Sequence, residues 1–163
     1  MHIILKNKKI YFNKYKVKCS IGKRGISKFK KEGDKMSPSG NFKLLYIMYR
    51  KDRVRKIKSK LKKIIIKKNM GWCDDVGSKY YNKLIKYPFN GKSERLFKKD
   101  HTYDIIIVLD YNLKPIKKNK GSAIFLHIVK KDYKPTLGCV AVSKKDMRLI
   151  LGCINQKSEI IIR

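Results

Sequence analysis

The chain has 163 residues and a mass of 19.2 kDa, which fits one domain better than two. Its 42% hydrophobic and 10% aromatic content is enough for an ordinary core and argues against intrinsic disorder. The 43 Lys and Arg residues against 12 Asp and Glu give a formal net charge of +31. Such a charge suits nucleic acid, a membrane surface or an acidic polymer. It does not identify the partner, because Lys, Ile, Asn and Tyr, all encoded by A/T-rich codons, supply close to half of the chain.

Several other classes of protein are disfavoured by the sequence. No apolar run reaches 18 residues, so no transmembrane helix is predicted. The opening MHIILKNKKI has too short an apolar stretch for a signal-peptide core and predicts a first strand. The four cysteines, Cys19, Cys73, Cys139 and Cys153, lie far apart without a C-x-x-C pair. We therefore expect no zinc site and no disulfide framework. Cys19, Cys73 and Cys153 are expected to pack as small apolar side chains.

Short β-prone runs separated by turn residues dominate the chain. They predict strands at 2–5, 9–12, 15–21, 42–50, 104–109, 123–128, 140–142 and 159–162. The run 104–109 is almost wholly apolar, which indicates a central strand buried on both faces. Ser143, with Asp146 three positions later, predicts the start of a helix over 144–154. The predicted fold is mainly β, with one or two helices.

Three segments lack clear periodicity. Residues 22–40 and 71–100 are expected to be long irregular loops, which in a compact domain usually carry function. The second holds the only Trp and a group of tyrosines. Residues 51–68 are the most basic stretch and predict either a hairpin or helix with its lysines in solvent, or an arm that binds nucleic acid. The first interpretation is favoured, because apolar residues interrupt the charge and no aromatic residue is present for base stacking.

One segment, residues 121–143, carries a pattern typical of nucleophilic catalysis. His127 ends a predicted strand, and Cys139 immediately precedes the next. A cysteine nucleophile reacts as the thiolate, so it needs a base such as His beside it. Gly138 leaves room for a substrate carbonyl close to the backbone, and the N–H groups of Gly138 and Cys139 are candidates for an oxyanion hole.

The same segment resembles the catalytic motif of the L,D-transpeptidase family (YkuD/ErfK domain), in which a His precedes a [Ser/Thr]-His-Gly-Cys element. Thr136, Gly138 and Cys139 match that element, and His127 matches the upstream histidine. Leu137 stands where the family has its second histidine. The Arg or Asn common after the cysteine is also missing, and the interval between His and Cys is shorter than usual.

The resemblance covers nearly the whole chain. Residues 31–42 are similar to the family's Gly/Thr-Pro-x-Gly-x-Phe entry segment, and residues 72–75, 81–82 and 101–104 look like those of a short, divergent branch of single-domain members. The resemblance implies one L,D-transpeptidase-like catalytic domain over residues 1–163, built as a β-sandwich or mixed sheet.

The resemblance also implies a reaction in cell-wall biogenesis, and with it a role in cell shape. Cys139 would attack a peptidoglycan stem tetrapeptide after its third residue, a diamino acid, and release D-alanine through a thioester. His127 would act as general base and then general acid. An acceptor amine would complete a cross-link, whereas water would make the protein an L,D-carboxypeptidase. We expect no metal or organic cofactor, anionic stem peptides as partner, no specific nucleic acid, and a monomer.

Further residues are candidates for contacts with the substrate, each with an ordinary structural role as the alternative: capping a strand, anchoring a loop or forming a turn. The candidates are His101, Tyr103, Trp72, Asp75 and Thr136. Glu32 and Asp34 either join the site or stabilise a lysine-rich loop. A backbone carbonyl near 134–137 is expected to orient His127, with Asp132 as the second choice.

Two alternatives and the location remain open at this point. A papain-like peptidase is disfavoured because its cysteine precedes its histidine, whereas His127 comes first here. A nucleic-acid-binding module would use residues 51–68 and have no need of Cys139. The implied substrate predicts the periplasm or cell envelope, whereas no signal peptide is visible, which leaves a cytoplasmic location open.

Overall fold

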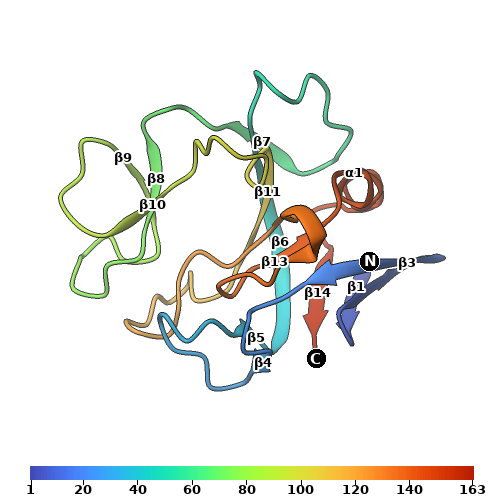
Figure 1. The fold of residues 1–163 in the computed structure, drawn as a ribbon, viewed down its shortest axis with the longest axis horizontal. Coiled ribbons are helices and arrows are strands. Elements are labelled where there is room, and N and C mark those ends of the chain that lie inside the picture. The colour runs from blue at the N-terminus through green and yellow to red at the C-terminus, as the bar shows by residue number, and fades with distance from the viewer.

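Fourteen strands and one α-helix make up the computed structural model, which describes residues 1–163 (Figure 1). In chain order these are β1 His2–Lys6, β2 Lys9–Phe12, β3 Tyr15–Ser20, β4 Ile26–Ser27, β5 Ser37–Pro38, β6 Gly40–Tyr49, β7 Lys62–Ile65, β8 Met70–Cys73, β9 Leu84–Lys86, β10 Ser93–Arg95, β11 Ile105–Leu109, β12 Phe125–Ile128, a 3₁₀ turn Lys131–Tyr133, β13 Val140–Val142, α1 Lys144–Cys153 and β14 Glu159–Ile162. The fold is mainly β with one late helix, which confirms the predicted class.

The main sheet is mixed, with the strand order β11-β12-β13-β3-β2-β1-β14-β6-β7. Strand β6 pairs with β14 over its first residues and with β11 over its later ones, so the pairings close into a ring. The pairs β1–β14, β12–β13 and β6–β7 are parallel, and the other pairs of the sheet are antiparallel. The parallel pair β12–β13 is the one that carries the predicted nucleophile and base.

The two faces of the sheet pack against different partners. Along β11 successive side chains point to opposite faces. Ile105 and Ile107 join the larger apolar core, which includes the buried face of α1, whereas Ile106 and Val108 join a smaller core with Trp72. All five residues of β11 are buried, as the apolar run predicted.

Helix α1 begins where the capping pattern placed it. The Ser143 hydroxyl accepts a hydrogen bond from the Asp146 N–H at 3.0 Å, which satisfies one of the free donors at the helix start. Met147, Ile150 and Leu151 are buried on the face that packs against the sheet. The helix ends at Cys153, one residue before the predicted end. No helix in the structure has the length and apolarity needed to cross a membrane.

Residues 71–100 were expected to be irregular, and this expectation was wrong. They contain most of a three-stranded sheet in the order β10-β8-β9, which lies on the side of the molecule away from α1 (Figure 1). Residues 22–40 likewise include both strands of the β4–β5 pair. These strands have two to four residues, too few for an alternating pattern to emerge.

The basic stretch 51–68 forms neither the predicted hairpin nor the predicted helix. It is a loop followed by β7, which adds to β6 as an edge strand. Val54, Leu61 and Ile66 are buried and attach the stretch to the body of the protein, while most of its lysines are exposed.

The four cysteines are free: Cys19 and Cys73 are buried, and Cys153 is partly buried.

Candidate active site

Two neighbouring parallel strands bring the predicted nucleophile and base to the same face. In the register of β12 and β13, His127 pairs with Ala141. Cys139 directly precedes β13 and, two residues before Ala141, points to the same face by strand alternation. The smaller apolar core confirms this placement, because Cys139 packs against it together with Phe125, which lies two residues before His127.

The Cys139 side chain is partly exposed and held in place by β12 and the segment before it. Its Sγ donates to the carbonyl oxygen of Ala123 at 3.1 Å and accepts from the Phe125 N–H at 3.4 Å. Burial, with the Glu94 carboxylate as a second cause, raises the pKa of the thiol to about 12. Cys139 is therefore a neutral thiol at rest, and a base must remove its proton before it can attack.

The His127 side chain is oriented to act as that base. Its Nδ1 lies 2.8 Å from the carbonyl oxygen of Ile128. A carbonyl oxygen only accepts hydrogen bonds, so Nδ1 carries the proton and Nε2 is left with a free lone pair. Burial lowers the pKa of His127 to about 4, which keeps the imidazole neutral at physiological pH. The ring of Tyr103 packs edge-on against the imidazole with 5.2 Å between centroids.

The orienting group is a backbone carbonyl, as expected, but its predicted position was wrong. It belongs to Ile128, the residue after the histidine, and not to residues 134–137. The second choice, Asp132, is exposed and lies in the 3₁₀ turn with φ +60°. The partner could not be identified from sequence, because any residue can supply a carbonyl.

A tight turn before β13 sets the position of the nucleophile. The Thr136 hydroxyl donates to the Cys139 carbonyl at 2.6 Å and accepts from the Gly138 N–H at 3.1 Å. From the neighbouring loop, the Ser37 hydroxyl donates to the Gly138 carbonyl at 2.8 Å. Gly138 has φ +143°, and a β-carbon there would lie 3.0 Å from the carbonyl oxygen of Met36. The turn thus requires glycine before the nucleophile.

This turn leaves only one of the two predicted oxyanion donors without a hydrogen-bond partner. The Gly138 N–H is already bonded to Thr136, whereas the Cys139 N–H donates to no protein acceptor. The structure therefore leaves the Cys139 N–H free for an incoming oxyanion. Thr136 was a candidate for substrate contact. Its hydroxyl makes two hydrogen bonds, and both lie within the turn.

Of the other candidate residues, only Tyr103 contacts the histidine. Tyr103 donates from its hydroxyl to Glu94 Oε1 at 2.9 Å, and Lys98 Nζ lies 2.7 Å from the same oxygen. His101 is largely exposed, with Nδ1 2.8 Å from Asp104 Oδ2. Sequence reasoning missed Glu94, since a single carboxylate between lysines gives no signal of its own.

Trp72 and Asp75 have structural roles in this arrangement. Trp72 is buried, its ring packs edge-on against Phe125 at 5.1 Å, and its indole N–H donates to Asn82 Oδ1 at 2.9 Å. It therefore supports the site from within the smaller core. The Asp75 carboxylate accepts from the Gly77 N–H at 3.0 Å and closes a turn.

Glu32 and Asp34 take different positions in the lysine-rich loop. Asp34 pairs with Lys30 at 2.7 Å, so it stabilises the loop as one alternative predicted. Glu32 accepts from the Tyr81 hydroxyl at 2.6 Å, and the same hydroxyl accepts from the Gly121 N–H at 3.0 Å. The loop is thus connected to the segment that leads to Ala123, the acceptor of the Cys139 thiol.

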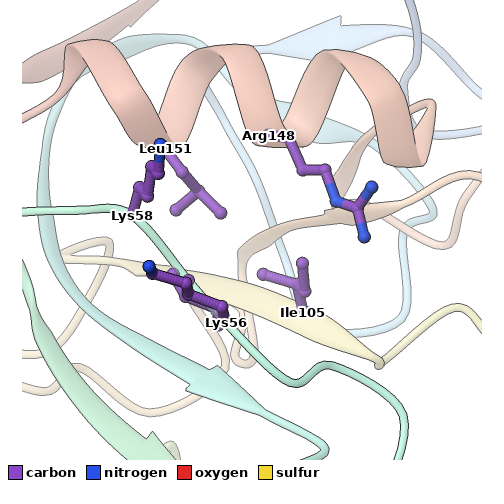
Figure 2. Close-up of a pocket in the computed structure, with 6 residues that line it drawn as sticks. Lys56, Lys58, Ile105, Arg148 and Leu151 are labelled. Carbon is purple, nitrogen blue, oxygen red and sulfur yellow. The ribbon is translucent and has the colours of Figure 1, made fainter.

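A separate cavity of about 200 Å³ lies on the opposite face of the sheet, between α1 and β11 (Figure 2). Ile105 from β11 and Leu151 from α1 contribute to its apolar lining, and both belong to the larger core. Lys56, Lys58 and Arg148 line it as well. Because Cys139 packs on the other face, this cavity is no part of the catalytic arrangement. No group of three or more His, Cys, Asp or Glu side chains is arranged to hold a metal ion.

Comparison with known proteins identifies the family of the chain. The family model of the YkuD L,D-transpeptidase catalytic domain matches residues 2–162. No curated protein sequence matches the chain at a significant level. The family match spans almost the full length and includes both His127 and Cys139. The chain belongs to the YkuD family of L,D-transpeptidase catalytic domains.

Proposed function

We propose that this protein is a peptidoglycan L,D-transpeptidase with Cys139 as nucleophile and His127 as general base and acid. The observation that carries the proposal is the pairing of His127 with Ala141, because it puts the imidazole on the face where the Cys139 thiol lies. The hydrogen bond from Nδ1 to Ile128 adds to it by leaving Nε2 as the proton acceptor.

The reaction starts from two neutral groups. The S–H leaves its hydrogen bond to Ala123, its proton passes to Nε2 of His127, and the sulfur adds to the carbonyl carbon of the donor stem peptide. The Cys139 N–H is the backbone donor available to the resulting oxyanion. His127 then returns the proton to the nitrogen of D-alanine, the C–N bond breaks, and a thioester remains on Cys139.

An amine on a second stem peptide completes the reaction. Its nitrogen attacks the thioester carbonyl, its proton passes to Nε2 of His127, and the C–S bond breaks. The thiolate regains its proton from the imidazolium, which restores both neutral groups. Water in place of the amine gives hydrolysis, and the protein is then an L,D-carboxypeptidase.

The charge of the protein is compatible with an anionic polymer as substrate, and a peptidoglycan substrate implies action in the cell envelope. With 43 basic and 12 acidic residues, the surface attracts the carboxylates of stem peptides over long range. Salt weakens this attraction, so it affects encounter more than chemistry.

The experiment uses a purified tetrapeptide stem as donor, with and without an acceptor stem that offers a free amine. D-alanine release with a cross-linked product, lost in Cys139→Ala and kept in Cys153→Ala, supports the transpeptidase. Cys153 is the matched control because it is also free and partly buried. D-alanine release without a cross-linked product would show that the protein hydrolyses the thioester and does not transfer the acyl group. No D-alanine release from the wild type contradicts both activities.

A further inference from the structure

Lys30 is the only lysine of the chain that is buried. Its side chain is 4% exposed, and its Nζ lies 2.7 Å from Asp34 Oδ1. The Asp34 carboxylate also accepts from the backbone N–H groups of Lys31 at 2.7 Å and Met36 at 2.9 Å. Burying an ion pair costs several kcal/mol of desolvation per ion, on the order of what its own attraction returns. Surface lysines carry no such cost, so the position of Lys30 requires a separate explanation.

The Lys30 side chain packs against Gly138 and Gly121, which belong to two different backbone segments that contact Cys139. A β-carbon on Gly138 would lie 3.3 Å from Lys30 Nζ, and a β-carbon on Gly121 would lie 2.8 Å from Lys30 Cε. Gly138 precedes the nucleophile directly. Gly121 begins the segment that ends at Ala123, whose carbonyl accepts the Cys139 thiol. Lys30 therefore packs against both backbone segments that fix the thiol.

The Lys30 ammonium is one of the charged groups that affect the pKa of the Cys139 thiol. Glu94 disfavours the Cys139 thiolate, whereas Lys98 and Lys30 favour it. Lys98 is paired with Glu94 and partly exposed, and His127 is neutral at rest. Of these two cations Lys30 is the more deeply buried, so its charge is the less screened by solvent. Its partner Asp34 offsets part of this effect.

We propose that Lys30 is a positioning residue for the acyl transfer. Its buried side chain holds the segments 121–123 and 136–139 in place, and its ammonium favours the negative charge that develops at Cys139. The proposal rests on the function proposed above for the chemistry, but its effect on the thiol is measurable without any substrate.

The first test measures alkylation of Cys139 by iodoacetamide from pH 7 to 11, with peptide mass spectrometry to separate it from the other cysteines. Because the pKa of the thiol is about 12, the midpoint lies above this range, and the measured quantity is the alkylation rate at each pH. Lys30→Met, which keeps the length and removes the charge, should lower this rate about tenfold across the range. Lys28→Met is the matched control, because Lys28 lies in the same loop and is exposed. An unchanged alkylation rate in folded Lys30→Met overturns the proposal.

Lys30→Arg keeps the test decisive if Lys30→Met does not fold. A folded Lys30→Arg should retain the wild-type alkylation rate, because the charge is preserved. An alkylation rate lowered about tenfold in folded Lys30→Arg shows that the charge is not what matters and overturns the proposal. Because alkylation needs no stem peptide, it still tests Lys30 if the wild type releases no D-alanine. The absence of D-alanine release would contradict only the proposed function and not the role of Lys30.

Discussion

Nδ1 of His127 lies 2.8 Å from the carbonyl oxygen of Ile128, the next residue along β12. This contact sets the tautomer of the ring and directs the free lone pair of Nε2 away from the backbone. The imidazole is thus oriented by the backbone of its own strand and not by a carboxylate. Burial keeps the imidazole and the thiol neutral at physiological pH, so His127 and Cys139 form no ion pair at rest.

The first prediction concerns the pH dependence of acylation. The pKa of His127 is lowered to about 4 by burial, so the base stays unprotonated well below the usual range of histidine. The rate of Cys139 acylation should therefore show no loss centred near pH 6.5 and should fall only as the pH approaches 4. Single-turnover rates with a stem-peptide donor between pH 4 and 8 measure this. A midpoint at 6 to 7 would show that the imidazole is solvated.

The second prediction concerns stability. The unfolded chain protonates His127 near pH 6.5, whereas the folded protein protonates it only near pH 4. Between these values the unfolded state binds more protons, so the free energy of unfolding falls as the pH falls. Relative to His127→Gln, the wild type should lose about 2 to 3 kcal/mol between pH 6.5 and 4. Urea unfolding at both pH values measures the difference, and equal losses in both proteins would contradict the buried neutral imidazole.

The third prediction separates two roles for Thr136. If its hydroxyl holds the turn, Thr136→Val should lower Cys139 alkylation and kcat by about tenfold, the cost of roughly one hydrogen bond, and change KM little. Thr102→Val is the control, because Thr102 is the only other threonine and its hydroxyl bonds to Asp100. A raised KM with normal alkylation would instead assign Thr136 to substrate contact.

The fourth prediction concerns Trp72. Because its ring packs on Phe125 inside the smaller core, Trp72→Ala should destabilise the protein by about 3 to 5 kcal/mol. Trp72→Phe keeps most of the packing but removes the bond to Asn82, and should cost about 1 to 2 kcal/mol with KM unchanged. Thermal unfolding and steady-state kinetics measure both effects. A large rise in KM for stable Trp72→Phe would restore the role in substrate contact that the sequence suggested.

The sequence predicted the elements whose signals are local. Ser143 and Asp146 mark the start of α1, and the apolar run of β11 marks a buried strand. His127 lies in β12, and Cys139 directly precedes the adjoining strand β13, as the pattern predicted. These features depend on neighbours along the chain, so one sequence is enough to find them.

The remaining features depend on contacts between distant segments. Strands β8 to β10 have three or four residues each, and Trp72 aligns with Glu94 only after the chain has turned back. Lys30 looks like any other lysine in so basic a chain, because its burial depends on Gly121 and Gly138, about 90 and 108 residues away. The partner of His127 is a main-chain group that residue identity does not reveal.

The measurement closest to the central claim is intact-protein mass spectrometry after a short incubation with the tetrapeptide donor and acid quenching. The account predicts a mass increase equal to the donor acyl group without D-alanine, located on Cys139 by peptide mapping, present in Cys153→Ala and absent in Cys139→Ala. His127→Gln should form the adduct at least about a hundredfold more slowly. An adduct of the same mass in Cys139→Ala, or none in the wild type at any donor concentration, would contradict the assignment of Cys139 as the nucleophile.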